Sequence, residues 1–311
     1  MLRHVGFLGF AFGFAALFAC GSSSSSNFED DAGSSSSSSS SSSGTIVTGK
    51  PDGSAVGPDG CADAAKLVYV VSAQDELYSF KPDTLTFTKI GKLSCPALPG
   101  ATPNSMAVDR TGTAWVNYND GELFKVSTTD ASCKATTYQA GQGGFVRMGM
   151  AFSSNSAGSS EETLFVSGVT GTNQPQGQGL GKIDLSTMTL TKIGMYSPPL
   201  TNQAAELTGT GDARLFGFFV TNPATLAQID KGTAATSGDK SLTGLTNILA
   251  WAFSFWGGDF WFYSASKVGE PSKVTRLKTS SDNSMSTVVA DVGFTIVGAG
   301  VSTCAPTTPV N

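Results

Sequence analysis

A repeated pattern of strand-forming segments most constrains what this chain can fold into. The segment FTKIG at residues 87–91 recurs as LTKIG at residues 190–194, an offset of 103 residues. Half of that offset is a unit of about 51 residues, typical of repeat architectures. A second repeat, an apolar residue opening a polar turn, occurs at intervals of 46, 57, 46 and 48 residues, at Phe80, Val126, Ile183, Ile229 and Leu277.

The content of each unit predicts the fold class. From residue 62 onward there is almost no helical periodicity, and short runs rich in Val, Phe, Tyr, Trp and Thr alternate with Gly, Asn, Asp and Pro. Strands joined by hairpin turns in units of this length are typical of β-propeller blades. We therefore expect an all-β, five-bladed β-propeller over residues 61–311, with six shorter blades as the alternative.

The ends of this region predict how the ring closes. The first repeat lacks an innermost strand, whereas residues 294–302 follow the fifth repeat without a unit of their own. We expect this terminal strand to complete the first blade. Cys61 and Cys304 would then lie on the same rim, so we predict a disulfide between them. Cys95 and Cys133, the other two cysteines of this region, would form a second, although blade order places them near opposite rims.

One segment resembles a known family. Residues 103–116, PNSMAVDRTGTAWV, resemble the first two strands of a blade in NHL-type and streptogramin-lyase-type propellers. The resemblance covers one blade closely and the others in outline, and it implies a tight turn at residues 109–112. For the lyases it also implies an elimination that uses histidine and magnesium. The only histidine here is His4, so the catalytic histidine of that family is missing.

The N-terminal segment predicts the location of the protein. Arg3 precedes an apolar run over residues 5–18, which is too short to span a bilayer and ends at Leu17-Phe18-Ala19-Cys20. This resembles a bacterial lipoprotein signal, which implies cleavage after residue 19 and lipidation of Cys20. With Gly21 rather than aspartate next, the resemblance favours the outer membrane of the cell envelope. An ordinary secreted protein with an incidental Cys20 is the alternative.

A serine-rich segment separates this signal from the repeats. Residues 20–60 contain an unbroken serine tract at 34–43 and two Pro-Asp-Gly turns, with little apolar surface to bury. Such composition predicts a disordered linker that tethers the head to the membrane.

Charge and composition exclude several classes of function. Nineteen Lys and Arg against 24 Asp and Glu give a net charge of −5, so nucleic acid is not expected as a partner. Without a histidine in the mature chain, Ser-His-Asp and Cys-His catalysis and histidine-ligated metals are excluded. The remaining four cysteines are even in number and lack close C-x-x-C spacing, which favours disulfides in an oxidising compartment.

Three residues are candidate ligand contacts. Arg147 and Glu206 each interrupt an apolar run assigned to an innermost strand, so we expect them to face the channel together as a charge pair. Trp256 is the best surface candidate of an aromatic hairpin at residues 251–263, whose other aromatics we expect in the core. Residues 169–181 are expected to form a long loop on one rim.

Related lactonase-type propellers supply an alternative function. The resemblance at Pro103-Asn104 implies an asparagine near a divalent cation at the channel mouth, here Ca²⁺ or Mg²⁺, with Asn104, Glu206 and Asn247 as candidate ligands. No acidic residue recurs at the corresponding positions, and we assign no catalytic residue, metal ligand or cofactor. The expected function is a lipid-anchored envelope protein displaying a binding or scaffolding module for a protein or glycan. A metal-dependent hydrolase acting at the channel mouth is the alternative.

Overall fold

The computed structural model describes residues 60–171, 176–267 and 269–310. The chain divides into two units, 1–47 and 48–311, and all described residues belong to the second. The predicted signal, Cys20 and nearly all of the linker lie outside the described residues. Within the described part, no helix has the length and apolarity needed to cross a membrane.

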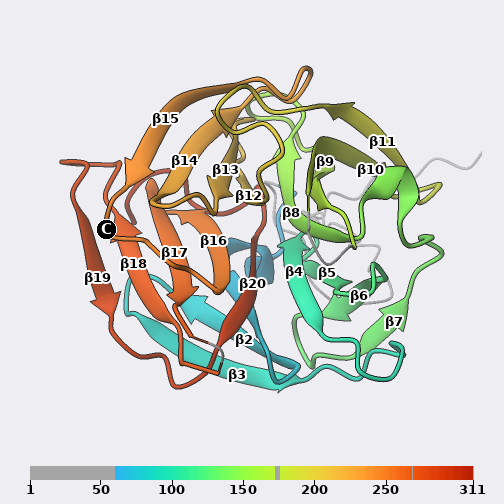
Figure 1. The fold of residues 1–311 in the computed structure, drawn as a ribbon. Coiled ribbons are helices and arrows are strands. Elements are labelled where there is room, and N and C mark those ends of the chain that lie inside the picture. Colours follow the sequence, from blue (N-terminus) through green and yellow to red (C-terminus); the bar gives the residue numbers. More distant parts are fainter. Residues whose placement is uncertain (1–59, 172–175, 268, 311) are drawn as a thin grey trace, which may run out of the picture. The chain divides into compact units, whose positions relative to one another are not determined.

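Five antiparallel sheets of four strands form a ring, as Figure 1 shows. The prediction of an all-β, five-bladed propeller is confirmed, and the six-bladed alternative is wrong. From the inner to the outer strand, blade 1 is β20 (Ile296–Val301), β1 (Val68–Ser72), β2 (Glu76–Lys81) and β3 (Thr86–Lys92). Blade 2 is β4 (Pro103–Val108), β5 (Thr113–Tyr118), β6 (Leu123–Ser127) and β7 (Cys133–Ala135).

The other three blades follow the same order from the inner to the outer strand. Blade 3 is β8 (Arg147–Ser154), β9 (Glu162–Val169), β10 (Gly177–Asp184) and β11 (Thr189–Gly194). Blade 4 is β12 (Ala205–Gly209), β13 (Leu215–Phe219), β14 (Ala224–Ile229) and β15 (Thr236–Leu242). Blade 5 is β16 (Ala250–Trp256), β17 (Asp259–Ala265), β18 (Lys273–Leu277) and β19 (Met285–Val289). Two 3-10 turns, η1 (Asp63–Lys66) and η2 (Gln142–Gly144), complete the described elements.

Closure of the ring follows the predicted scheme. Strand β20, from the C-terminal end of the repeats, pairs antiparallel with β1, with Val301 opposite Val68. Cys61 and Cys304 form a disulfide beside this pairing. The Ser302 hydroxyl also donates to the backbone carbonyl of Ala65 at 2.7 Å. The two ends of the propeller are therefore joined by a sheet, a covalent bond and a buried hydrogen bond.

The second disulfide joins blade 2 to the connector that precedes it. Cys95 follows β3, and Cys133 begins β7, the outer edge strand of blade 2, with 4.8 Å between their Cα atoms. The predicted pairing is confirmed, but the expectation that the two cysteines lie near opposite rims is wrong. The connector between blades 1 and 2 passes the outer edge of blade 2, which brings Cys95 to it.

The inner strands approach one another closely enough to require glycine. A Cβ atom at Gly149, in β8, would lie 2.0 Å from the carbonyl oxygen of Ala205 in β12. A Cβ atom at Gly298, in β20, would lie 2.9 Å from the Cα atom of Ser105 in β4. Backbone therefore packs directly against backbone at the centre of the ring.

The predicted aromatic hairpin is present, and its aromatic side chains other than Trp251 are buried. Strands β16 and β17 pair from Ala250↔Ala265 to Trp256↔Asp259, turning at Gly257-Gly258. Phe253 and Phe262 of this hairpin belong to a hydrophobic cluster shared with Phe218 of blade 4. Core packing of these aromatics between blades is thus confirmed.

The loop expected at residues 169–181 is shorter than predicted. Residues 177–181 belong to β10, where Leu180 and Gly181 pair with Ser167 and Val166 of β9. The glycines and glutamines that suggested a loop instead belong to a strand whose register shifts between Gly177 and Gly179. Such irregularities accommodate glycine within a strand.

We expect Gly149→Ala to destabilise the propeller by about 1 to 3 kcal/mol or more, because the added methyl group meets fixed backbone rather than a flexible side chain. Urea denaturation of the purified protein measures this loss. Gly232→Ala is the control, since a Cβ atom there has only an ordinary contact, 3.5 Å from the Asp230 carboxylate. Equal stabilities of the two variants would contradict the close approach of β8 and β12.

Candidate functional site: the channel mouth

The inner strands of all five blades line one opening of the central channel. Each contributes its first or second residue to a pocket of about 230 Å³. These residues are Asn104 of β4, Arg147 of β8, Glu206 of β12, Ala250 of β16 and Val297 of β20. We call this pocket the channel mouth. The prediction that Arg147 and Glu206 face the axis at the same place agrees with this geometry.

Glu206 bridges two blades that are not neighbours. Its side chain is buried, and its Oε2 atom accepts a hydrogen bond of 2.7 Å from the hydroxyl of Ser105 in blade 2. A Cβ atom at Gly149, in the inner strand of blade 3, would lie 2.8 Å from the Glu206 Cα atom. Burial raises the pKa of Glu206 well above its usual range, and the Ser105 hydrogen bond lowers it only partly.

Arg147 is the cation of the channel mouth. It is the first residue of β8 and is partly exposed. Among the described residues, its guanidinium group has no ion pair and no hydrogen-bond partner. The expected charge pair between Arg147 and Glu206 is therefore not formed, because the Glu206 carboxyl group turns inward to Ser105. The guanidinium donors remain available to a ligand.

The candidate cation ligands are not brought together. The Asn104 amide nitrogen donates to Asn117 Oδ1 and to the Met148 carbonyl, both at 3.2 Å, so this side chain links blades 2 and 3. Asn247 lies in an exposed turn before β16, with φ of 52°, rather than on an innermost strand. Its predicted place on an innermost strand is wrong. In the described part of the chain, no group of three or more His, Cys, Asp and Glu side chains is placed to hold a metal ion.

The two tryptophans of β16 lie opposite to expectation. We expected Trp256 on the surface and Trp251 in the core. Trp256 is buried, and its indole N–H donates to the backbone carbonyl of Lys66 at 2.9 Å. The prediction that Trp256 lies on the surface is wrong, because the end of η1 lies against its indole ring. Trp251, at the other end of the strand, is partly exposed and lines the channel mouth. Sequence reasoning missed Trp251; its position near the start of an innermost strand, as for Arg147, is the signal that could have identified it.

Glu162 is a partly buried acid that the sequence pattern did not reveal. It begins β9 and accepts hydrogen bonds from the Arg110 backbone N–H at 2.8 Å and the Thr303 hydroxyl at 2.7 Å. It thus joins blade 3 to blade 2 and to the segment after β20. Burial raises its pKa to about 7. In the sequence Glu162 follows another acidic residue, Glu161, and so it cannot be distinguished from an ordinary exposed acid.

Comparisons with known proteins bear only on the fold of this chain. The sequence matches no family model and no curated protein. Hydrazine synthase from Kuenenia stuttgartiensis is similar in structure, with 13% identity, a TM-score of 0.41, and coverage of 81% of this chain and 71% of that one. A nidogen/laminin complex chain is 12% identical, with a TM-score of 0.46 and coverage of 76% and 80%. A Bacteroides caccae protein of unknown function is 13% identical, with a TM-score of 0.40 and coverage of 72% and 73%.

We expect Glu206→Gln to change how stability depends on pH. Because the pKa of Glu206 is raised on folding, the folded protein keeps a proton that the unfolded chain loses above about pH 4.5. The free energy of unfolding contributed by this group therefore falls as the pH rises from there through the raised pKa. The Glu206→Gln variant lacks this pH-dependent loss. Its free energy of unfolding relative to that of the wild type therefore increases with pH, as measured by urea denaturation at several pH values.

The matched control is Glu161→Gln, because Glu161 is exposed. Its stability should follow that of the wild type across the same pH range. Parallel curves for the wild type and Glu206→Gln would show that the Glu206 carboxyl group is not desolvated on folding.

Proposed function

We propose that this chain is a lipid-anchored protein of the bacterial cell envelope, in the outer membrane, whose propeller binds a ligand at the channel mouth. The β-propeller fold supports a binding or scaffolding module, since propellers present rim loops and a channel opening on a rigid ring. The motif at residues 17–20 supports the anchor, and the serine-rich segment before residue 60 supports a tether. The two disulfides agree with export to an oxidising compartment.

The unpaired guanidinium of Arg147 carries the proposal of a binding site. It lies in a pocket to which all five blades contribute, beside the partly exposed Trp251. Arginine forms charge-assisted, bidentate hydrogen bonds with carboxylate and phosphate groups. A volume of about 230 Å³ suits one small acidic group of a larger partner, rather than a whole ligand. The partner is therefore a protein or glycan that presents an acidic group.

The rival function, a metal-dependent hydrolase at the channel mouth, is not favoured by the geometry. Asn247 is not on an innermost strand and does not line the channel mouth, and the Asn104 amide is committed to two partners in blades 2 and 3. Glu206 directs one of its oxygen atoms to the Ser105 hydroxyl. The three side chains do not converge on one point where a cation would sit.

Replacing Cys20 tests the anchor. We expect the wild-type protein to incorporate an alkyne-labelled fatty acid and to sediment with membranes. Cys20→Ala should lose the label and the lipoprotein cleavage, since a thiol is the acylated group. Ser22→Ala, two residues away, should behave as the wild type. Retention of the fatty-acid label by Cys20→Ala would overturn the proposed anchor.

Replacing Arg147 tests the binding site. Titration with a panel of small carboxylates, from acetate to glucuronate, should change the Trp251 fluorescence, and Trp251→Phe should remove this signal. Arg147→Ala should weaken binding about tenfold or more, and Arg147→Lys should weaken it less, because charge is kept but the bidentate geometry is lost. Lys182→Ala, an exposed cation elsewhere, is the control. Binding unaffected by Arg147→Ala would refute the site.

A further inference from the structure

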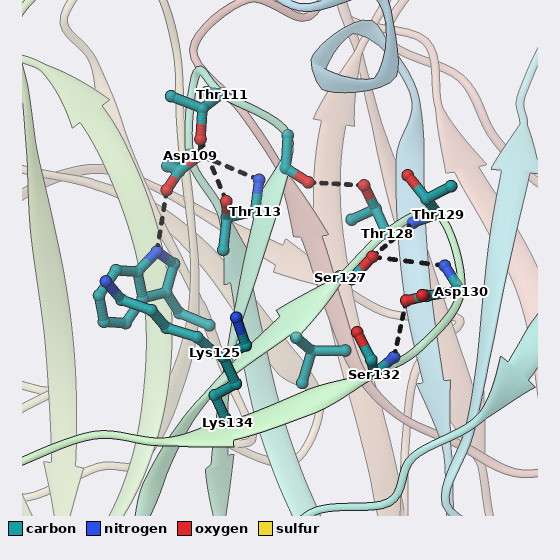
Figure 2. Close-up of a pocket in the computed structure, with 13 residues that line it drawn as sticks. Asp109, Thr111, Thr113, Lys125, Ser127, Thr128, Thr129, Asp130, Ser132 and Lys134 are labelled. Atoms are coloured by element: carbon teal, nitrogen blue, oxygen red, sulfur yellow. Dashed lines mark hydrogen bonds between the residues drawn. The ribbon is translucent and has the colours of Figure 1, made fainter. Parts of the chain in front are cut away.

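Blade 2 carries a second pocket, at the rim opposite the channel mouth. Strand β4 begins at the channel mouth and ends at Val108, so the β4–β5 turn lies at the other rim, as does the β6–β7 turn. These two turns and the strands below them line a pocket of about 570 Å³, more than twice the volume of the channel mouth. We call it the blade 2 pocket, and Figure 2 shows its polar side chains.

Strand register places a single polar face on this pocket. Thr113 lies opposite Ser127, and Trp115 lies opposite Lys125, which in turn lies opposite Lys134. These side chains therefore point to the same side of the blade. The residues that alternate with them in β5, Ala114 and Val116, face the other side and belong to the core shared with blade 1.

Two lysines form the cationic part of this face. Lys125 and Lys134 are exposed and directly opposite each other, a placement in which like charges destabilise a sheet. The Lys125 ammonium group lies 4.6 Å from the centroid of the Trp115 ring. Neither ammonium group has an ion pair or hydrogen bond to another described residue. An anionic group bound between them would relieve their repulsion.

The two acidic side chains of the pocket, Asp109 and Asp130, already accept hydrogen bonds within the turns that they stabilise. Asp109 Oδ1 accepts from the backbone N–H groups of Thr111 and Thr113 and from the Thr111 hydroxyl. Asp109 Oδ2 accepts from the Trp115 indole N–H at 3.1 Å. Asp130 accepts from the Ser132 backbone N–H, and such bonds lower its pKa. Neither acid forms an ion pair with either lysine.

Hydroxyl groups complete the lining. Those of Thr111, Thr113, Ser127, Thr129 and Ser132 all belong to residues of the pocket. The Ser127 hydroxyl oxygen accepts from the backbone N–H of Thr129 at 3.2 Å, and the Ser127 and Ser132 hydroxyls interact with the Asp130 carboxyl group. Hydroxyl donors and acceptors around two ammonium groups, above an indole ring, match a ligand that has many hydroxyl groups and a negative charge. The volume suits two to three sugar rings.

We propose that the blade 2 pocket binds an acidic saccharide, with a carboxylate between Lys125 and Lys134 and sugar hydroxyls on the Ser and Thr side chains. Trp115 is 3% exposed, so the first contacts are made by the lysines and not by stacking on the ring. A carboxylate that draws the Lys125 ammonium group from the indole face changes the surroundings of Trp115, which makes its fluorescence a local reporter. The proposal does not depend on the anchor or on the channel mouth.

Calorimetric titration of the purified full-length chain with three probes tests the proposal. We expect trigalacturonate to bind at least tenfold more tightly than neutral maltotriose and than inorganic phosphate. The double variant K125A/K134A should weaken trigalacturonate binding at least tenfold, and K125R/K134R should retain it. The wild-type fluorescence change on binding should disappear in Trp115→Phe. Equal binding of maltotriose would overturn the acidic character of the ligand, and equal binding of phosphate would overturn its saccharide character.

Two controls separate this site from other causes. K182A/K192A removes two exposed lysines from neighbouring strands of blade 3 and should leave trigalacturonate binding unchanged. Lys273→Ala should also leave it unchanged, because Lys273 is an exposed lysine of blade 5, outside both pockets. A loss of binding in either control, or undiminished binding in a K125A/K134A protein with wild-type circular dichroism, would overturn the assignment to the blade 2 pocket.

Discussion

The close approach of the inner strands is the constraint on which the rest of this propeller depends. Five strands surround the axis, and between blades 3 and 4 the peptide backbones meet with room only for a hydrogen atom at Gly149. Across this centre the Glu206 carboxyl group of blade 4 accepts a hydrogen bond from the Ser105 hydroxyl of blade 2. The channel is therefore crossed by a hydrogen bond just below its mouth, and the mouth is a shallow pocket.

The fold was predictable because the signals that define it are local or periodic. Hairpin turns such as residues 109–112 and 257–258 are specified by Asp and Gly at positions where the chain must reverse, and the blade repeat recurs along the sequence. Ring closure was predictable because residues 294–302 follow the fifth repeat as one extra strand, and the first repeat lacks its innermost strand. Cys61 and Cys304 then had to lie near each other, as they do.

The candidate site was predictable only in part, because burial depends on which neighbour covers a residue. Arg147 and Glu206 were found by their interruption of apolar strands, and both line the mouth. Arg147 and Glu206 form no ion pair, because the Glu206 carboxyl group instead accepts a hydrogen bond from Ser105, about a hundred residues away in sequence. Trp256 is covered by η1, and no local pattern shows that cover. Glu162 gains its partners Arg110 and Thr303 only when three distant segments meet.

The position of β20 has a consequence for the order in which this molecule is built. The strand next to the axis in blade 1 is the one that a ribosome makes after β1 to β19. Until it arrives, β1 exposes unpaired backbone N–H and C=O groups, an edge that invites mispairing with other chains. Blade 1 is therefore complete only after the whole repeat region has been made, so the last strand to be synthesised is the one that closes the ring.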